Sequence, residues 1–318
     1  MAQGIEVAVR EVGLRDGLQS IDATMATEAK QEWCRREHAA GVPEIEVCSF
    51  VPPKLLPQFS DAEAVVRYAL TLEGLRVAVL VPNVKGAMRA IEAGAHKLSF
   101  PFSVSESHSK ANVRRSVAES LEEFKRILAL RAPSNGGGRP LVSGGLATAF
   151  GCSIEGAVDE DRVRRLAGAL AEMGADEIVV ADTVGYGHPA AVRRVFEAVK
   201  REVADLPVAA HFHDTRGLGL ANVFAALDAG VAAFDASLGG FGGCPYAPGA
   251  SGNIATEDLV FMLEHMGYAT GVDLERLLDV RTLLRTALPD TRLHGVIAQA
   301  GLPKNYHATA PAQEAAAR

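Results

Sequence analysis

Two histidines at the end of a predicted strand are the residues whose type and spacing first suggest chemistry. His211 and His213 close an apolar run that starts at Pro207 and is followed by polar residues and Gly217, which is typical of a buried strand. Strand side chains alternate between two faces, so both imidazoles are expected on one side, close enough to grip one cation. Two histidines hydrogen-bonded within a core are the alternative, and a His-x-His spacing alone does not exclude it.

Further polar residues stand at the ends of other predicted strands. The first strand runs into Arg15 and Asp16, and the sixth ends at Asp182. Asn253 closes the glycine-rich segment after the eighth strand, and Glu46 lies near the middle of the second. If the strands close into a barrel, these side chains converge on one rim, which favours a functional site over chance.

The donor types within this group indicate which metal they could hold. His211, His213, Asp16 and Asn253 offer two imidazoles, one carboxylate and one amide oxygen. A mixed nitrogen and oxygen set without thiolate favours six-coordinate manganese or magnesium over structural zinc, although affinity alone would rank zinc higher. Coordination positions left open for substrate oxygens would make this a Lewis acid site.

Three charged residues are candidates for supporting roles. Arg15 beside Asp16 could be a surface salt bridge of little energetic value, but near a cation its guanidinium is placed to hold an anionic oxygen formed during reaction. A carboxylate within a strand is costly to bury unless it is paired, so we expect Glu46 to pair with Arg15 and orient it. For Asp182 we expect a role in orienting the site or handling a proton.

The four cysteines are scattered without Cys-x-x-Cys spacing, which is typical of reduced thiols in a cytosolic protein. Cys244 lies in a glycine-rich loop, where exposure beside a cation would keep it reactive as an acid or base, although a lone cysteine is more often inert packing. Cys34 and Cys48 are expected in the core. For Cys152, at a strand end, the choice stays open.

The scaffold that would position these residues alternates strands with helices. Buried runs predict eight strands, at residues 5–12, 45–50, 76–81, 97–102, 141–150, 177–181, 207–213 and 232–237. Helices are predicted at residues 27–40, 61–72, 84–93, 113–131, 159–173, 189–203, 218–229, 256–266 and 274–287, and a polar loop at 103–112.

This alternation predicts an α/β fold, a (β/α)8 TIM barrel with a C-terminal helical extension. The barrel is expected over about residues 5–269, within a single domain at 1–302, followed by a flexible alanine-rich tail at 303–318. An open doubly wound sheet is the alternative, although no Gly-x-Gly-x-x-Gly follows the first strand.

Composition narrows the choice of partners and location. A formal net charge of −7 argues against nucleic acid or an anionic membrane as a partner. No apolar run is long enough to span a bilayer, and no signal peptide opens the chain, so a cytoplasmic location is expected. A homodimer is an open option.

Three motifs together resemble the 3-hydroxy-3-methylglutaryl-coenzyme A lyase family. They are Glu-Val-Gly-Leu-Arg-Asp-Gly-Leu-Gln at 11–19, His-Phe-His-Asp-Thr at 211–215, and Gly-Gly-Cys-Pro-Tyr-Ala-Pro-Gly-Ala-Ser-Gly-Asn at 242–253. The third motif is long, and it separates these lyases from condensing synthases that share the barrel, the Arg-Asp pair and the His-x-His. The likeness extends from about residue 7 to residue 274.

The resemblance implies an acyl-coenzyme A substrate and a divalent metal, magnesium or manganese, held by Asp16, His211, His213 and Asn253. It implies cleavage between C2 and C3 of a 3-hydroxy-acyl thioester by a retro-Claisen reaction, a step of leucine degradation. Arg15 would bind substrate and stabilise the thioester enolate, and Cys244 would handle a proton.

Three departures from the family pattern leave the substrate open. Leu14 replaces the usual proline, Ser20-Ile21 replaces Asn-Glu, and Val179 stands where the family often has a serine facing the substrate. Loss of that hydroxyl favours a more apolar substituent, so a longer 3-alkyl group is an alternative. A condensing synthase on the same scaffold and a metal-binding barrel without catalysis are the other hypotheses.

Overall fold

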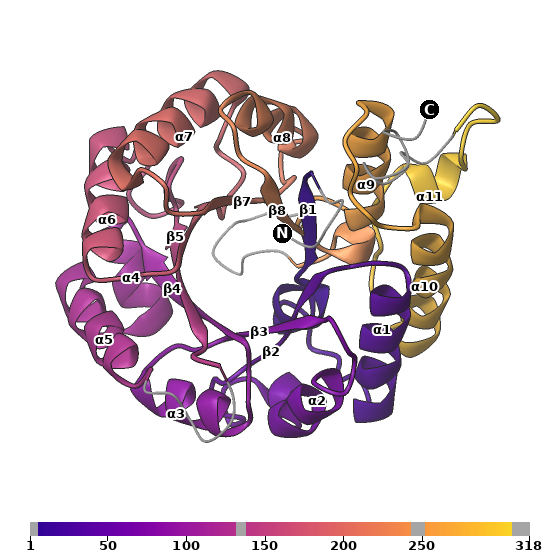
Figure 1. Ribbon diagram of the computed structural model, residues 1–318, viewed down its shortest axis with the longest axis horizontal. Helices are drawn as coiled ribbons and strands as arrows, with labels where there is room; N and C mark the ends of the chain where they lie inside the picture. The colour runs from indigo at the N-terminus through magenta and orange to yellow at the C-terminus, as the bar shows by residue number, and fades with distance from the viewer. Residues whose placement is uncertain (1–5, 132–137, 243–251, 307–318) are drawn as a thin grey trace.

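The computed structural model describes residues 6–131, 138–242 and 252–306. Eight parallel strands form a closed barrel in chain order, and helices surround it (Figure 1). Closure is made by β1 and β8, which pair in parallel from Ala8 with Ala233 to Glu11 with Ala236. The predicted TIM barrel is therefore confirmed, and the open sheet is excluded.

Each predicted strand overlaps one observed strand. The strands are β1 (Ala8–Glu11), β2 (Glu44–Ser49), β3 (Arg76–Leu80), β4 (Lys97–Ser103), β5 (Leu141–Ala147), β6 (Glu177–Asp182), β7 (Val208–Phe212) and β8 (Ala233–Ala236). Helices cover the outer face of the strands, so a strand is enclosed on both sides. This enclosure explains why the strands read as apolar runs without clear alternation.

The helices also follow the prediction, with two additions. They are α1 (Thr27–Ala39), α2 (Ala62–Ala69), α3 (Val84–Glu92), α4 (Glu106–Val113), α5 (Val117–Ala129), α6 (Glu160–Glu172), α7 (Pro189–Val203), α8 (Gly219–Asp228), α9 (Thr256–His265), α10 (Leu274–Ala287) and α11 (Ile297–Ala300). Three short turns complete the elements: the π-helical η1 (Gly13–Gly17) and the 3-10 turns η2 (Pro57–Phe59) and η3 (Leu238–Gly240).

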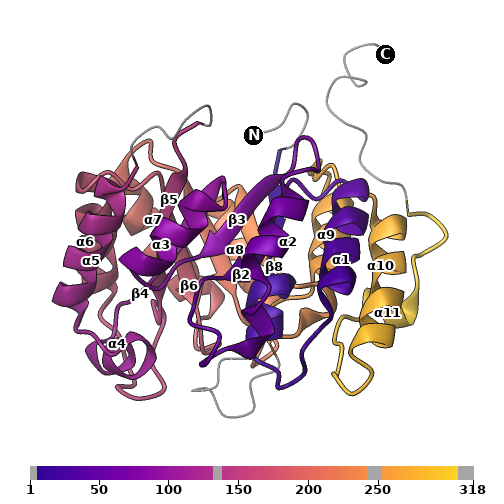
Figure 2. The ribbon, with the colours of Figure 1, turned by 90° about the horizontal axis from the view of Figure 1, so that it is seen from below.

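The prediction of a polar loop at residues 103–112 is wrong, because α4 begins at Glu106. Ser105 caps this helix by accepting a hydrogen bond from the His108 N–H at 3.2 Å. The helix has almost no apolar face, so its periodicity gave no signal. Figure 2 places α4 at the lower end of the barrel, where β4 ends, so this end carries the carboxyl ends of the strands.

A buried network of ion pairs crosses the barrel interior. Arg10 of β1 lies 2.7 Å from Asp235 of β8 and 2.8 Å from Glu177 of β6. Lys97 of β4 closes the network with contacts of 2.7 Å to Glu44 and 2.6 Å to Glu177. Every charged group in this layer has a partner of opposite sign, which is the condition for burying charge.

The last helices extend the barrel beside its first helix, and both views place α10 next to α1 (Figures 1 and 2). The backbone N–H of Asp273 donates to the carbonyl of Ala40 at 2.7 Å. Gly41 has φ of 97°, and a Cβ there would run into the carbonyl oxygen of Gly271. Glycine therefore ends α1 where the extension crosses it.

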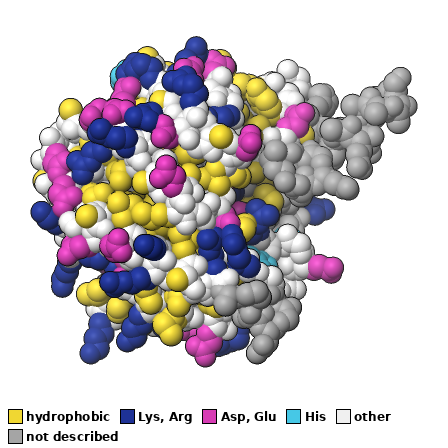
Figure 3. All heavy atoms as spheres, turned by 60° about the vertical axis from the view of Figure 1, so that its left-hand side comes forward, with side chains coloured by type: hydrophobic (Ala, Val, Ile, Leu, Met, Phe, Trp, Pro, Cys, Tyr) yellow, Lys and Arg dark blue, Asp and Glu magenta, His cyan; other side chains and the backbone are white. Residues whose placement is uncertain are grey.

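The division into one domain at 1–302 and a tail at 303–318 stays a prediction, and residues 307–318 lie outside the described ones. Among the helices in the described ranges, none has the length and apolar character needed to cross a bilayer. On the face drawn in Figure 3, basic and acidic side chains are interspersed around an apolar area, so that face carries no strong field of one sign.

Candidate functional site

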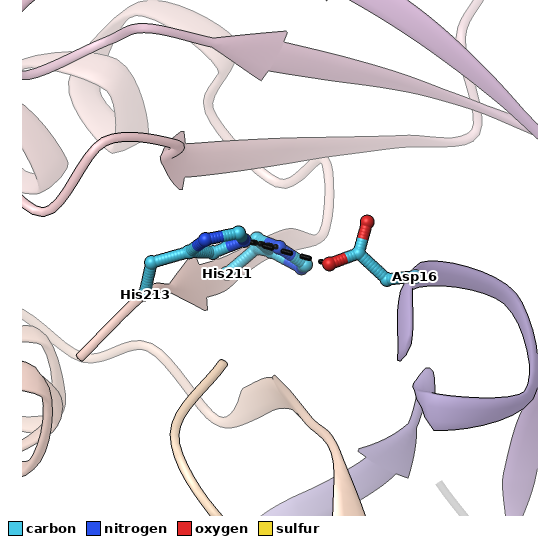
Figure 4. Close-up of side chains that lie close together, drawn as sticks. All are labelled: Asp16, His211 and His213. Atoms are coloured by element: carbon cyan, nitrogen blue, oxygen red, sulfur yellow. Dashed lines mark hydrogen bonds and ion pairs between the residues drawn. The ribbon is translucent and has the colours of Figure 1, made fainter. Parts of the chain in front are cut away.

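The two histidines at the end of β7 lie side by side at the barrel mouth. The Nε2 atoms of His211 and His213 lie 3.1 Å apart, and both side chains are buried. The predicted placement on one side of the strand is therefore what the structure has. Figure 4 shows the two rings together, with the Asp16 carboxylate pointing toward them from the opposite side.

Asp16 is delivered by η1, a π-helical turn that directly follows β1. Its Oδ2 atom lies 3.5 Å from Nε2 of His213. One donor atom from each of Asp16, His211 and His213 lies within 4.8 Å of the others. Burial raises the pKa of Asp16, but the charge of Arg15 and the hydrogen bond with His213 outweigh it and hold that pKa well below its usual range.

Asn253 reaches the same point from the segment after β8. It forms a bridge with His213, and the next residue, Ile254, donates its N–H to the Phe212 carbonyl at 3.1 Å. The Asn253 Nδ2 atom donates to Oδ2 of Asp16 at 2.7 Å. Four side chains from three separate stretches of sequence thus converge at one rim.

The donor atoms of this cluster fit a divalent cation. Without a cation, two ring nitrogens 3.1 Å apart are compatible only if one of them carries a proton. The Oδ1 of Asn253 is buried with no hydrogen-bond partner in the described part of the chain. Buried polar atoms are normally satisfied, so an unpaired amide oxygen beside a carboxylate and two imidazoles is what a metal site offers.

Asp235 of β8 stands behind His211. Its Oδ2 lies 3.2 Å from Nδ1 of His211, and its Oδ1 accepts from Nε of Arg10 at 2.8 Å. A carboxylate only accepts, so Nδ1 of His211 carries the proton and Nε2 presents its lone pair to the cluster. Burial lowers the pKa of His211, but the hydrogen bond with Asp235 and the charge of Asp16 outweigh it and raise that pKa.

Arg15 is held between two carboxylates. Its Nε donates to Glu46 of β2 and its guanidinium also pairs with Asp16, so the expected pairing with Glu46 is present. Burial lowers the pKa of Arg15, but the charges of Asp16 and Glu46 more than offset it, so the guanidinium stays charged. A catalytic role for either residue stays a prediction.

Asp182 lies next to the cluster, but its side chain is hydrogen-bonded to the loop that follows β6. Its two oxygens accept from the backbone N–H groups of Tyr186 at 2.9 Å and Gly187 at 2.8 Å. Its carbonyl accepts from the N–H of His213 at 3.3 Å. Burial raises the pKa of the Asp182 carboxyl, although the backbone donors oppose this. Asp182 therefore holds together the loop after β6 and the carboxyl end of β7.

The cysteines fall into two groups. Cys244, with the loop around it, lies outside the described residues, so its role stays a prediction. Cys34 and Cys48 are buried, and burial raises the pKa of both thiols, which agrees with core packing. Cys152 is also buried and accepts a hydrogen bond from the Ser105 hydroxyl at 3.1 Å.

Comparison with known proteins shows the family of this chain. The family model described as HMGL-like matches residues 6–284, most of the chain. The chain belongs to the HMGL-like family.

Relatives of known name resemble this HMGL-like chain over most of their length. It is 43% identical to a hydroxymethylglutaryl-CoA lyase of Bacillus subtilis (strain 168), over 86% of this chain and 90% of that protein. It is 41% identical to a mitochondrial hydroxymethylglutaryl-CoA lyase of Gallus gallus, over 92% and 97%. The solved structure of an HMG-CoA lyase from Acenitobacter baumannii, in complex with coenzyme A and 3-methylmalate, aligns with a TM-score of 0.89 at 38% identity, over 96% of this chain and 99% of that chain.

The structure shows where two of the departures predicted from the family resemblance lie. Leu14 is fully buried. Val179 of β6 points into the barrel, where it lines a cavity of about 20 Å³ together with Glu46 and Asp235. A cavity of this size has room for one water molecule. Val179 therefore lines the same cavity as Glu46, which contacts Arg15, and Asp235, which contacts His211.

Two residues beside the site were not recognised from the sequence. Asp235 and Glu11 both lie in strands that are otherwise mostly apolar, and both are buried. A charged residue inside a buried strand is costly unless it is paired. Each carboxylate was therefore a signal of the same kind as Glu46, and it could have been found in the same way.

Proposed function

We propose that the protein is a divalent-metal-dependent carbon–carbon lyase, which cleaves 3-hydroxy-3-methylglutaryl-CoA to acetyl-CoA and acetoacetate by a retro-Claisen reaction. The observation that carries this proposal is the convergence of Asp16, His211 and His213 at the barrel rim, with donor atoms within 4.8 Å of one another. Membership of the HMGL-like family and relatives that are hydroxymethylglutaryl-CoA lyases support the same reaction.

The metal ligands in this proposal are Asp16, His211, His213 and Asn253. The mixed nitrogen and oxygen set favours magnesium or manganese. A cation bound there supplies Lewis acidity toward substrate oxygens. The protein's own part is to fix the ligands: Asp235 holds the ring of His211 at 3.2 Å, and the bridge to His213 holds Asn253.

Arg15 and Cys244 carry the other two roles. The guanidinium of Arg15 is held by Glu46, so it can donate to the thioester enolate oxygen without first having to be ordered. Asp182 would keep the neighbouring loop in place. Cys244 would deliver a proton to the enolate carbon; its position at the glycine-rich loop before Asn253 supports this role.

An acyl-CoA partner follows from the same proposal. The solved relative from Acenitobacter baumannii contains coenzyme A and 3-methylmalate. Leucine degradation and a cytoplasmic location complete the proposal, although named relatives include both mitochondrial and cytoplasmic proteins. Light scattering of the purified protein would decide whether it is a homodimer.

An acetyl-CoA release assay tests the reaction. Purified protein with manganese should release acetyl-CoA from 3-hydroxy-3-methylglutaryl-CoA, and EDTA should abolish the release. Replacing Cys244 by Ala should lower kcat by about a hundredfold or more, which is typical of losing a positioned proton donor. No release from any 3-hydroxy-3-alkylglutaryl thioester would rule out the lyase, and an unaffected Cys244→Ala variant would rule out this thiol.

A longer 3-alkyl substrate is the second candidate, because Val179 presents an apolar side chain to the barrel interior where the family resemblance leads us to expect a serine. One extra methylene is worth about 10-fold or more in discrimination when it fills an apolar pocket. The kcat/KM ratio between 3-ethyl and 3-methyl substrates should therefore fall in a Val179→Ser variant. An unchanged ratio would show that this position does not set specificity.

A further inference from the structure

Glu11, the last residue of β1, is buried and accepts hydrogen bonds from three different elements. Its side chain accepts from the N–H of Gly13 at 2.7 Å, from the N–H of Leu238 at 3.0 Å and from the hydroxyl of Thr256 at 2.7 Å. Arg10 just before it points into the barrel, so Glu11 points to the opposite side, toward the helices. None of the roles proposed above uses this carboxylate.

A second buried carboxyl group, that of Glu37 in α1, lies beside Glu11. Two neighbouring carboxylates away from water cannot both ionise. Trp33 is the neighbouring side-chain donor of Glu37, whereas Glu11 accepts from two backbone N–H groups and a hydroxyl. When one of the two groups ionises, the negative charge therefore belongs on Glu11, and Glu37 keeps its proton.

The three donors belong to the segments that supply the metal ligands. Gly13 opens η1, which carries Arg15 and Asp16. Leu238 opens η3 after β8, and Thr256 opens α9, three residues after Asn253. One carboxylate thus links the turn that presents Asp16 to the segment that presents Asn253, behind the 2.7 Å contact between those two side chains.

We propose that Glu11 is a positioning residue, which holds η1 in register with the segment around Asn253 so that Asp16 and Asn253 face the same cation. This inference rests on the metal centre of the proposed function. Three strong donors on one acceptor set the spacing of both segments, and removing the acceptor would leave those donors buried and unpaired.

Manganese binding to EDTA-treated protein tests the role directly, because it needs no substrate. We compare Glu11→Met, which keeps the length of the side chain but accepts nothing, with Glu11→Gln. The Gln oxygen can accept from Gly13 and Leu238 while its amide donates to the Thr256 hydroxyl. We expect Glu11→Met to raise the Kd for Mn²⁺ about tenfold or more, and Glu11→Gln to recover most of that loss.

Glu264 provides a matched control at the other end of α9. It is buried and accepts from the N–H of Thr270 at 2.9 Å and from its hydroxyl at 2.6 Å. Glu264→Met should lower the Tm but leave the Kd for Mn²⁺ unchanged. A merely structural role for Glu11 would make the two variants behave alike.

Thr256→Val keeps the test decisive if Glu11→Met does not fold. This near-isosteric change removes one donor, and it should raise the Kd for Mn²⁺ about threefold with the fold retained. An unchanged Kd in Thr256→Val, or in folded Glu11→Met, would overturn the role of Glu11 while leaving the lyase intact. A wild-type protein that binds no Mn²⁺ would overturn the metal centre, and this inference with it.

Discussion

At the scale of single residues, the site depends on side chains that lie behind the proposed metal ligands. His211 and His213 could each adopt either tautomer, and only a fixed acceptor decides which nitrogen presents a lone pair. Asp235 is that acceptor for His211, and Arg10 fixes Asp235 in turn. The tautomer and orientation of His211 at the rim are therefore set by the buried ion pairs in the layer beneath it.

Replacing Asp235 by Asn should weaken Mn²⁺ binding by about 10- to 100-fold, because a neutral amide is a poorer acceptor for the proton on Nδ1 of His211 and leaves Arg10 without its full partner. Calorimetric titration with MnCl₂ measures this. Asp176→Asn is the control, since Asp176 also pairs with arginines, Arg131 and Arg139, but away from the cluster. Equal affinities for the Asp235 variant and the wild type would contradict the role given to Asp235.

The candidate metal ligands could be predicted from the sequence, but the buried carboxylates that position them were not recognised. His211 and His213 were predictable because two imidazoles on one side of a strand end suit a cation better than an apolar core. Asp235 and Glu11 could have been noticed as carboxylates within strands, as Glu46 was, but which groups each of them contacts becomes clear only when the barrel closes. Cys244 stays a prediction of the motif alone.

At the scale of elements, short turns rather than long helices place the reactive groups. Asp16 lies in η1, which is only five residues long, and Asn253 is held by an isolated β-bridge to His213. Gly17 permits this arrangement, because a Cβ there would lie 2.7 Å from the ring of Phe241. Short turns of this kind depend on tertiary contacts. The strands and helices could therefore be predicted from the sequence, but the π-helical turn η1 could not.

The outer helices should affect stability without affecting chemistry. In α5, Ser116 and Glu119 form a capping box at the N-terminus. Ser116→Ala should lower the free energy of unfolding by about 1 kcal/mol, because one N–H of the first turn loses its acceptor. Urea denaturation measures this loss, with Glu119→Gln as a milder control. A tenfold fall in kcat in Ser116→Ala would contradict the separation between the outer helices and the rim.

At the scale of the whole molecule, barrel closure brings residues that are distant in the sequence together at one site. Residues 15 and 253 are far apart in the chain, yet β1 lies between β8 and β2, and β7 pairs with β8. This topology was predictable from the alternation of apolar runs and helices. The exception, α4, has a polar sequence whose helix depends on a capping serine.

Closure also buries Glu11 and Glu37 together, with a consequence for stability. Burial raises the pKa of Glu11 from 4.5 to about 7, so between those values the folded protein binds more protons than the unfolded chain. Stability present below pH 4.5 is therefore lost as the pH rises toward 7, by about 3 kcal/mol from this group.

Burial and the charge of Glu11 also raise the pKa of Glu37 well above its usual value. Glu37→Gln removes this second titrating group, so the unfolding free energy of the variant should fall less between pH 5 and pH 8 than that of the wild type. Urea denaturation at several pH values measures both curves. Parallel curves for the two proteins would contradict the coupling between these carboxyl groups.

All of the proposed chemistry requires that one divalent cation is held by side chains from the ends of β1, β7 and β8. Anomalous scattering by manganese, recorded from a crystal of the protein grown with MnCl₂, locates that cation. We predict one strong peak at about 2.0–2.4 Å from Nε2 of His211, Nε2 of His213 and an oxygen of Asp16. A manganese peak elsewhere, with these three side chains bound to no ion, would contradict the proposed metal centre.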